Sequence, residues 1–130
     1  MFNKLMAFGI KVNNFAKLYK FYKDVLKLKP KKEDLKNEFA EFFVGEGVVA
    51  LLTDKTLDGM CGINYFNFVN NRTNFVIAVE VKSVKKAVDD LRKKDVEIVT
   101  EPKTTPWGQK VAYFRDPEGN IWELSEPFSE

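Results

Sequence analysis

Carboxylates are the main candidates for chemistry in this chain of 130 residues, because it contains no histidine and a single cysteine, Cys61. Without histidine the chain lacks the commonest general base and the usual zinc or iron ligand. Cys61 has no clustered cation near it in the sequence to stabilise a thiolate. Glu123 lies between Trp122 and Leu124, and a strand would turn it away from these two large apolar residues. We therefore expect Glu123 to face a ligand site.

The elements that would position Glu123 follow from two patterns that each occur twice. Apolar residues alternate with other residues at 8–12 and again at 77–81, as in a strand with one buried face. After each strand a capping residue, Asn14 or Ser83, precedes apolar residues at helical spacing. These residues are Phe15, Leu18, Tyr19 and Tyr22 in the first segment and Val84, Ala87, Val88 and Leu91 in the second. The matching spacing predicts an internal repeat.

A hairpin is predicted at the end of each repeat. Residues 39–54 align without a gap with residues 111–126, which makes Leu51 the counterpart of Glu123. Residues 116–120 contain the Pro and Gly of a tight turn. One more strand fits between helix and hairpin, near residues 31–35 and 97–100. Each copy therefore has the order β-α-β-β-β.

These patterns predict an α+β fold made of two tandem βαβββ modules. Module one covers about residues 1–54, a linker without clean periodicity covers about 55–74, and module two covers about 75–130. A module of roughly 60 residues buries too little surface to be comfortably stable alone. We therefore expect residues 1–130 to form a single domain.

Three segments carry a resemblance to a known family: AYFRDPEGNIWELSE at 112–126, FAKLYKFYKDVLKL at 15–28 and PWGQ at 106–109. Through them the chain resembles the glyoxalase/bleomycin-resistance/dioxygenase (vicinal oxygen chelate) superfamily over nearly its whole length. The resemblance implies two modules whose curved mixed sheets enclose a cup, often completed by a second subunit. Such a cup can hold a metal and a substrate with neighbouring oxygens.

The resemblance also implies four metal-ligand positions, which fall at Ala7, Leu51, Val76 and Glu123. Only the last of these side chains can ligate a metal. Because a divalent cation needs roughly four to six donors, we expect no tightly bound metal and no other cofactor. A weak site made of carboxylates alone, such as Glu41 and Glu80, stays open as an alternative.

Glu123 itself has two interpretations. In a concave, partly apolar place it can act as an acid or base, or bind a cationic or hydroxyl group. Alternatively, it is a remnant of an ancestral metal site, paired with Arg115 or Lys11 across the sheet. The sequence alone leaves both open.

The strand phase of Glu123 and Ala7 predicts the other side chains that line the cup. The predicted ligand-binding residues are Lys11, Phe43, Leu51, Trp107, Gln109, Tyr113 and Glu123, with Gly9 and Val49 in phase beside them. Residues 104–109 are predicted to form a loop at the mouth of the cup. An aromatic, mostly apolar lining suits a small flat or apolar molecule. The same aromatic residues would equally suit a core or a subunit interface.

The partners follow from composition and the N-terminus. Lys and Arg number 21 against 19 Asp and Glu, and the net charge of +2 is spread along the chain, so we expect no nucleic acid partner. No run approaches the roughly 18 apolar residues of a membrane span, and the N-terminus lacks a secretory signal. We expect a cytoplasmic protein, and a homodimer that buries the aromatic residues at 65–68.

Two functions are compatible with these features. The first is a metal-free protein of the bleomycin-resistance type that binds an aromatic or cationic small molecule in an apolar cup. The alternative is an enzyme of the superfamily, a lyase, isomerase or dioxygenase, using Glu123 with a metal bound by nonstandard ligands. A third reading is a subunit that has lost ligand binding and acts only through its surfaces.

Overall fold

The structure is a computed structural model that describes residues 1, 5–56, 76–105 and 108–127. The chain divides into two compact units, Met1–Asn71 and Arg72–Glu130. We call them unit one and unit two. Most of the predicted linker, including Cys61 and the aromatic residues at 65–68, lies outside the described residues, as does Trp107. That the two units act as a single domain therefore stays a prediction.

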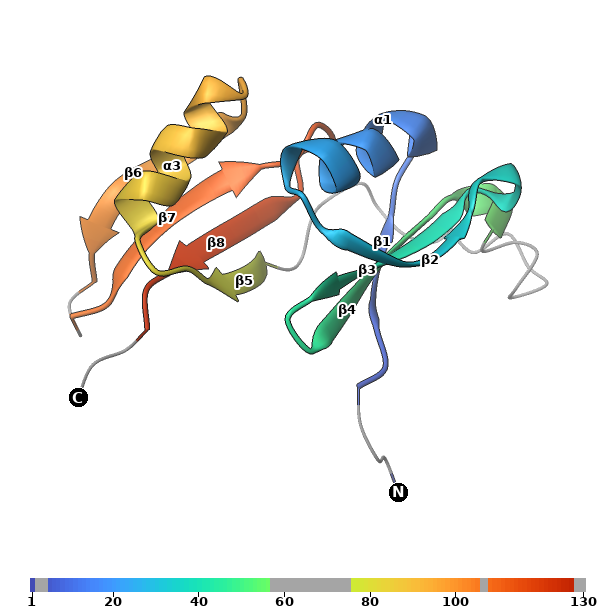
Figure 1. The fold of residues 1–130 in the computed structure, drawn as a ribbon, viewed down its shortest axis with the longest axis horizontal. Helices are drawn as coiled ribbons and strands as arrows, with labels where there is room; N and C mark the ends of the chain where they lie inside the picture. The colour runs from blue at the N-terminus through green and yellow to red at the C-terminus, as the bar shows by residue number, and fades with distance from the viewer. Residues whose placement is uncertain (2–4, 57–75, 106–107, 128–130) are drawn as a thin grey trace. The chain divides into compact units, whose positions relative to one another are not determined.

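Unit one is a four-stranded mixed sheet with a helix on one face (Figure 1). Its elements are β1 (Phe8–Lys11), α1 (Phe15–Lys20), the π-helix η1 (Phe21–Val25), β2 (Lys29–Asp34), the 3₁₀ helix η2 (Leu35–Asn37), β3 (Phe39–Val44) and β4 (Gly47–Leu52). The strand order is β1-β4-β3-β2, with β1 parallel to β4 and the other pairs antiparallel.

Unit two has the same order of strands in its sheet, and its α-helix likewise follows the first strand. Its elements are β5 (Val76–Glu80), α3 (Val84–Lys93), β6 (Glu97–Thr104), β7 (Lys110–Arg115) and β8 (Ile121–Ser125). The strand order is β5-β8-β7-β6, with β5 parallel to β8. The predicted α+β class and the β-α-β-β-β order within each unit are confirmed.

Both predicted helix starts are confirmed by their caps. The Asn14 side chain accepts a hydrogen bond from the Lys17 amide at 3.2 Å, and Ser83 does the same for Lys86 at 3.2 Å. Each cap satisfies one backbone donor that the first helical turn leaves without a partner. At the end of α1 the chain widens into the π-helix η1, where the Leu26 amide donates to the Phe21 carbonyl at 3.0 Å.

Each helix packs on one face of its own sheet, and alternate strand residues form the core there. In unit two, Phe114 and Trp122 stack with ring centroids 5.8 Å apart, beneath the buried Val84 and Val88 of α3. In unit one, Phe42 packs edge-to-face against Tyr22, with ring centroids 6.1 Å apart. Burying one such side chain stabilises the fold by roughly 1.5–3 kcal/mol. Because side chains alternate along a strand, the intervening strand residues point to the opposite face of each sheet.

The two hairpins differ in turn length by one residue. In unit one, two residues separate the paired Val44 and Gly47. In unit two, the counterpart of Val44 is Asp116, and three residues separate it from Asn120, whose carbonyl accepts from the Asp116 amide at 3.0 Å. The Asp116 carboxylate also accepts from the Glu118 and Asn120 amides at 2.9 Å each, and Gly119 has a φ of 88°. The extra residue is thus part of a hydrogen-bonded turn.

This difference corrects the ungapped alignment of the two hairpins. Ala40 pairs with Leu51, whereas its counterpart Ala112 pairs with Leu124. Leu51 therefore corresponds to Leu124, and the residue that corresponds to Glu123 is Ala50. The alignment is wrong by one position after the turn.

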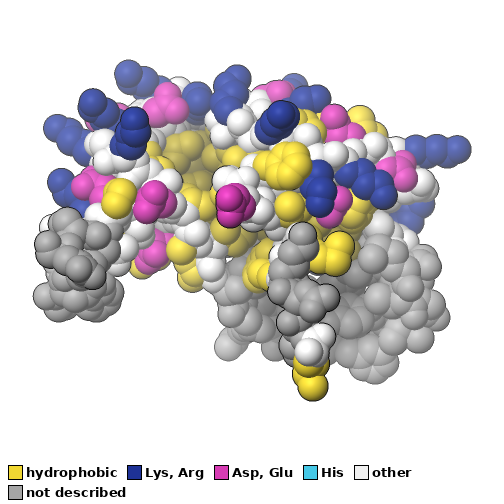
Figure 2. Space-filling view, turned by 60° about the horizontal axis from the view of Figure 1, so that its bottom comes forward, with side chains coloured by type: hydrophobic (Ala, Val, Ile, Leu, Met, Phe, Trp, Pro, Cys, Tyr) yellow, Lys and Arg dark blue, Asp and Glu magenta, His cyan; other side chains and the backbone are white. Residues whose placement is uncertain are grey.

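Charged and large apolar side chains lie side by side on the face drawn in Figure 2. Figure 2 shows lysine and arginine side chains projecting over much of the face that it draws, with apolar side chains between them. Leu5 and Met6 are 84% and 74% exposed, and Val76 and Val99 are exposed on their strands. Among the described residues, none of the helices combines the length and apolar character needed to cross a bilayer.

Candidate functional site

The strongest candidate site lies on the face of the unit two sheet opposite α3. The register places Glu123 on β8 between Ala78 on β5 and Tyr113 on β7. Because side chains alternate along a strand, Ile121 and Ser125 project from β8 on the same side. We call Ala78, Tyr113, Ile121, Glu123 and Ser125 the Glu123 face. Glu123 and Tyr113 are half-buried there, whereas Trp122 and Leu124 are buried on the helix side, as the alternation predicts.

Two hydroxyl groups hold the Glu123 carboxylate. The Tyr113 hydroxyl donates to Oε1 at 2.5 Å, and the Ser125 hydroxyl donates to Oε2 at 3.1 Å. An ionised carboxylate has about four acceptor positions, and these two bonds use only two of them. The carboxylate is thus oriented by the protein and can still accept hydrogen bonds from a ligand.

The pKa of the Tyr113 phenol is raised above its usual value. The largest cause is the hydrogen bond that its neutral form donates to Glu123, followed by burial and then by repulsion between the phenolate and the carboxylate. Tyr113 is therefore a neutral hydrogen-bond donor at physiological pH. The pair offers a ligand one negative charge beside an aromatic ring.

The residues at the implied metal-ligand positions do not fit a metal. Ala7, Ala50 and Val76 carry no donor atom, with Ala50 taking the place that the alignment had given to Leu51. Within the described ranges no three His, Cys, Asp or Glu side chains come together. One carboxylate leaves a divalent cation several donors short of the roughly four to six it needs.

The two other carboxylates of the predicted alternative site lie on different sheets. Glu80 ends β5, where it pairs with Ser125 and is exposed. Glu41 lies on β3 of unit one and pairs with Ala50. Each is described within its own unit only.

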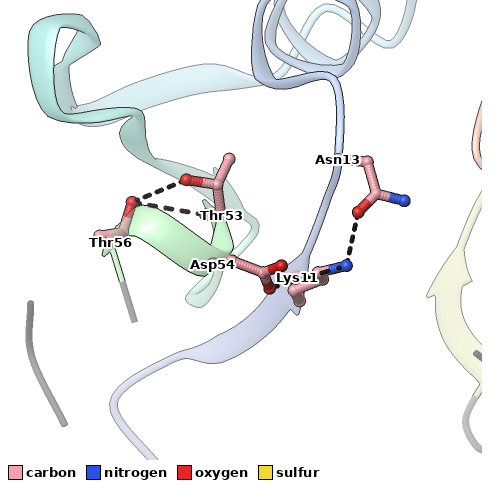
Figure 3. Close-up of polar contacts among 5 residues, drawn as sticks. All are labelled: Lys11, Asn13, Thr53, Asp54 and Thr56. Atoms are coloured by element: carbon pink, nitrogen blue, oxygen red, sulfur yellow. Dashed lines mark hydrogen bonds and ion pairs between the residues drawn. The ribbon is translucent and has the colours of Figure 1, made fainter. Parts of the chain in front are cut away.

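Lys11 is engaged within unit one. Its ammonium group donates to the Asn13 side chain at 2.5 Å and lies 3.7 Å from the Asp54 carboxylate (Figure 3). Beside it, the Thr56 hydroxyl lies 3.3 Å from the Thr53 hydroxyl. The Thr56 hydroxyl also donates a hydrogen bond to the backbone carbonyl of Asn37 in η2. These contacts tie the end of β1 to the segment after β4, which is a structural role for Lys11.

The other predicted ligand-binding residues of unit one divide between the two faces of its sheet. Phe43 is 37% exposed and lies in phase with Glu41 and, across the sheet, with Gly9 and Lys11. Leu51 is fully buried on the face that α1 covers, and Val49 lies on that face too. The expectation that Leu51 and Val49 share a face with Lys11 is therefore wrong, because the register places them one position out of phase.

Gln109 closes the loop before β7 through its backbone. Its amide donates to the Thr105 hydroxyl at 3.0 Å, and its carbonyl accepts from the Thr105 amide at 2.8 Å. Ser125 was not predicted as a site residue. It lies two residues after Glu123 on the same strand, so the alternation that selected Glu123 would also have selected Ser125.

The chain is similar to known proteins over nearly its whole length. The family model of the Glyoxalase-like domain matches residues 5–129. The uncharacterized protein YraH of Bacillus subtilis (strain 168) is 32% identical over 123 residues, which are 93% of this chain and 96% of that protein.

Solved structures with the same fold include a glyoxalase/bleomycin resistance protein/dioxygenase from Nocardioides. Its TM-score is 0.80 at 20% identity, covering 97% of this chain and 84% of that one. A lactoylglutathione lyase from Agrobacterium tumefaciens has a TM-score of 0.72 at 15% identity, covering 95% and 92%. At these identities the similarity extends to the fold alone.

Proposed function

This chain belongs to the glyoxalase/bleomycin-resistance/dioxygenase superfamily, and from that premise we propose that it binds a small organic molecule without a resident metal. The ligand contacts the Glu123 face, and its chemical class is an aromatic or apolar body that carries a cationic or hydroxyl group. The observation that carries the proposal is the Glu123 carboxylate, which two protein hydroxyls orient and which keeps free acceptor capacity.

The surroundings of Glu123 support this ligand class. The Tyr113 ring and the Ile121 side chain are half-buried, and Ala78 is exposed beside them, so a ligand would cover apolar surface around one carboxylate. A cation near an aromatic ring and a carboxylate gains both a charge-assisted hydrogen bond and a cation–π contact. A ligand anion would instead be repelled by the Glu123 carboxylate.

The donor set supports a metal-free mode of binding. The positions that would complete a metal site carry Ala7, Ala50 and Val76, so Glu123 is available to the ligand itself. Glu123 thus offers the ligand a hydrogen-bond acceptor.

A homodimer and a cytoplasmic location are also part of the proposal. Leu5 and Met6, at 84% and 74% exposure, present apolar surface near β1 that a second copy would cover. The single cysteine suits a reducing compartment, where structural disulfides are rare.

The test is an amide NMR screen of the folded chain with small aromatic amines, alkylammonium compounds and matched neutral analogues. A cationic ligand is expected to shift the amide signals of β7 and β8. The Glu123→Gln variant keeps the size of the side chain and removes its charge, so affinity for the cation should fall about tenfold. Glu46→Gln, an exposed charge in the β3–β4 turn, is the matched control and should leave affinity unchanged.

Two results would overturn the proposal. The first is binding that is equally strong in wild type and Glu123→Gln. The second is conversion of a bound compound to product at a rate that depends on Glu123 and on an added metal, which would establish the enzyme alternative.

A further inference from the structure

A groove lies in unit one, and none of its lining residues belongs to the Glu123 face. Its volume is about 390 Å³, within the range of roughly 300–1,000 Å³ that small-molecule sites occupy. Phe15 and Tyr19 of α1 and Leu35 of η2 supply its apolar surface. Lys20 and Lys23 supply its positive charge.

The apolar part of the groove is partly aromatic. The Phe15 and Tyr19 rings stack with centroids 5.8 Å apart and an angle of 16° between their planes. Leu35, which also lines the groove, is 52% exposed, so its side chain is accessible to a ligand. Together these side chains give the groove an apolar, partly aromatic lining, which suits an apolar ligand body.

The charged part of the groove is positive. The Lys23 ammonium lies 5.4 Å from the Tyr19 ring centroid, 3.1 Å from the Tyr19 hydroxyl and 3.5 Å from the Glu33 carboxylate. It is therefore held at the groove beside the aromatic surface. Lys20 is exposed, and Asp24 is the single acidic residue among the lining side chains.

The chain around the groove has the same sign of charge. Residues 17–36 contain eight lysines and three acidic residues, although the whole chain has a net charge of only +2. The lysines are Lys17, Lys20, Lys23, Lys27, Lys29, Lys31, Lys32 and Lys36. The positive charge is thus concentrated in the segment that forms the groove. The small net charge of the whole chain does not reveal this concentration.

We propose that this groove binds small organic anions with a flat aromatic body, such as aromatic carboxylates or sulfonates. The ring of the ligand packs on Tyr19 and Leu35, and its anionic group faces Lys20 and Lys23. Neither the residues nor the sign of charge is shared with the Glu123 face, so this proposal does not depend on the proposed function. A cationic ligand of the Glu123 face would be repelled here.

The test uses naphthoate as the probe and naphthamide as its neutral counterpart, each titrated into the folded chain and followed by amide NMR. Naphthoate should shift the amide signals of α1 and η2 and bind more tightly than naphthamide. Exposed charges about 6 Å apart interact weakly in water and are screened by salt. Lys20→Gln and Lys23→Gln should therefore each weaken naphthoate binding by about two- to fivefold, with a smaller effect at high salt.

Three further variants sharpen the result. Asp24→Asn should strengthen naphthoate binding by a similar factor, because it removes the acidic charge that lines the groove. Leu35→Ala should weaken both compounds, because it removes apolar surface. Lys17→Gln is the matched control, since Lys17 lies on the same helix but does not line the groove, and it should weaken naphthoate binding less than Lys20→Gln does.

The proposal is overturned if naphthoate and naphthamide bind equally, if the shifted signals belong to β7 and β8, or if neither compound binds at millimolar concentration. Because Lys23 also contacts Glu33, loss of binding in Lys23→Gln counts only when its amide spectrum matches that of the wild type. Lys20→Gln gives the independent result.

Discussion

The hydrogen bond between Tyr113 and Glu123 predicts how the stability of the protein depends on pH. Tyr113→Phe removes the phenol that donates to the carboxylate at 2.5 Å and leaves the ring in place. A hydrogen bond to a charged group contributes about 1.5–3 kcal/mol, and water partly replaces it where both groups are half-buried. We therefore expect the variant to be less stable by about 1 kcal/mol at neutral pH, or by about 4 °C in melting temperature.

The sign of the pH dependence follows from the raised pKa of Tyr113. The unfolded chain loses the phenol proton near its usual pKa of about 10, before the folded chain does, so the folded state binds more protons above that pH. The contribution of Tyr113 is therefore fully present below about pH 10 and is lost as the pH rises through the raised pKa of the folded state. The stability difference between wild type and Tyr113→Phe should shrink above pH 10.

Urea unfolding followed by circular dichroism at a series of pH values measures this difference. A second readout is the ultraviolet absorbance of tyrosinate. Comparison of wild type with Tyr113→Phe identifies the titration of Tyr113. In Glu123→Gln this titration should move to lower pH. Tyr19→Phe is the control for loss of a hydroxyl, since among the described residues the Tyr19 hydroxyl accepts a hydrogen bond from the exposed Lys23. It should lower the free energy of unfolding by less than about 0.5 kcal/mol at neutral pH. A stability difference that is the same at neutral and alkaline pH would refute the reasoning.

Three further predictions concern the fold that positions the site. Leu51→Ala should lower the free energy of unfolding by about 2–5 kcal/mol, because Leu51 is fully buried. Leu35→Ala should lower it by less than about 1 kcal/mol, because Leu35 is exposed. Equal urea midpoints for the two variants would contradict the register. Gly119→Ala should cost about 1–2 kcal/mol in thermal unfolding because of the φ of 88°, and Gly9→Ala, with ordinary backbone geometry, should cost less. Asp116→Ala should cost about 2–4 kcal/mol because it leaves buried turn amides without their acceptor, and a near-neutral result in urea unfolding would show that the turn does not need these bonds.

Features set by short-range interactions were predictable from the sequence. Asn14 and Ser83 were expected as helix caps, and both accept the hydrogen bond that a cap provides. The alternation around Glu123 placed it opposite two apolar neighbours, and the hairpin placed Tyr113 on the adjacent strand, where the two side chains meet. Caps and alternation depend only on residues a few positions apart.

The register of the unit one hairpin was not predictable in the same way. Glu46 and Gly47 matched Glu118 and Gly119 in the ungapped alignment, so the turns looked equal in length. In the structure Gly45, with a φ of 58°, has the positive φ that Gly119 has in unit two. The length of a turn depends on its backbone conformation and hydrogen bonds, which residue identities indicate only weakly. The one-residue error moved Leu51 from the helix-covered face to the predicted ligand face.

The end of α1 shows a second limit. Tyr22 fits the spacing of a continued α-helix, but it lies in the π-helix Phe21–Val25. A periodic pattern of apolar residues over so few positions does not distinguish one widened turn from an ordinary one. The groove beside Tyr19 and Lys23 was likewise not predicted, since Leu35 reaches it from a separate element.

The most direct test of metal-free binding is elemental analysis of protein purified without chelator, repeated after soaking with nickel, zinc, manganese and iron and desalting. With one carboxylate and no other donor at the implied ligand positions, a divalent cation should bind no more tightly than roughly 10⁻⁴ M, so desalting should remove it. Far less than one metal per chain is expected in every sample. One equivalent of metal that stays bound, and is lost in Glu123→Gln, would contradict it.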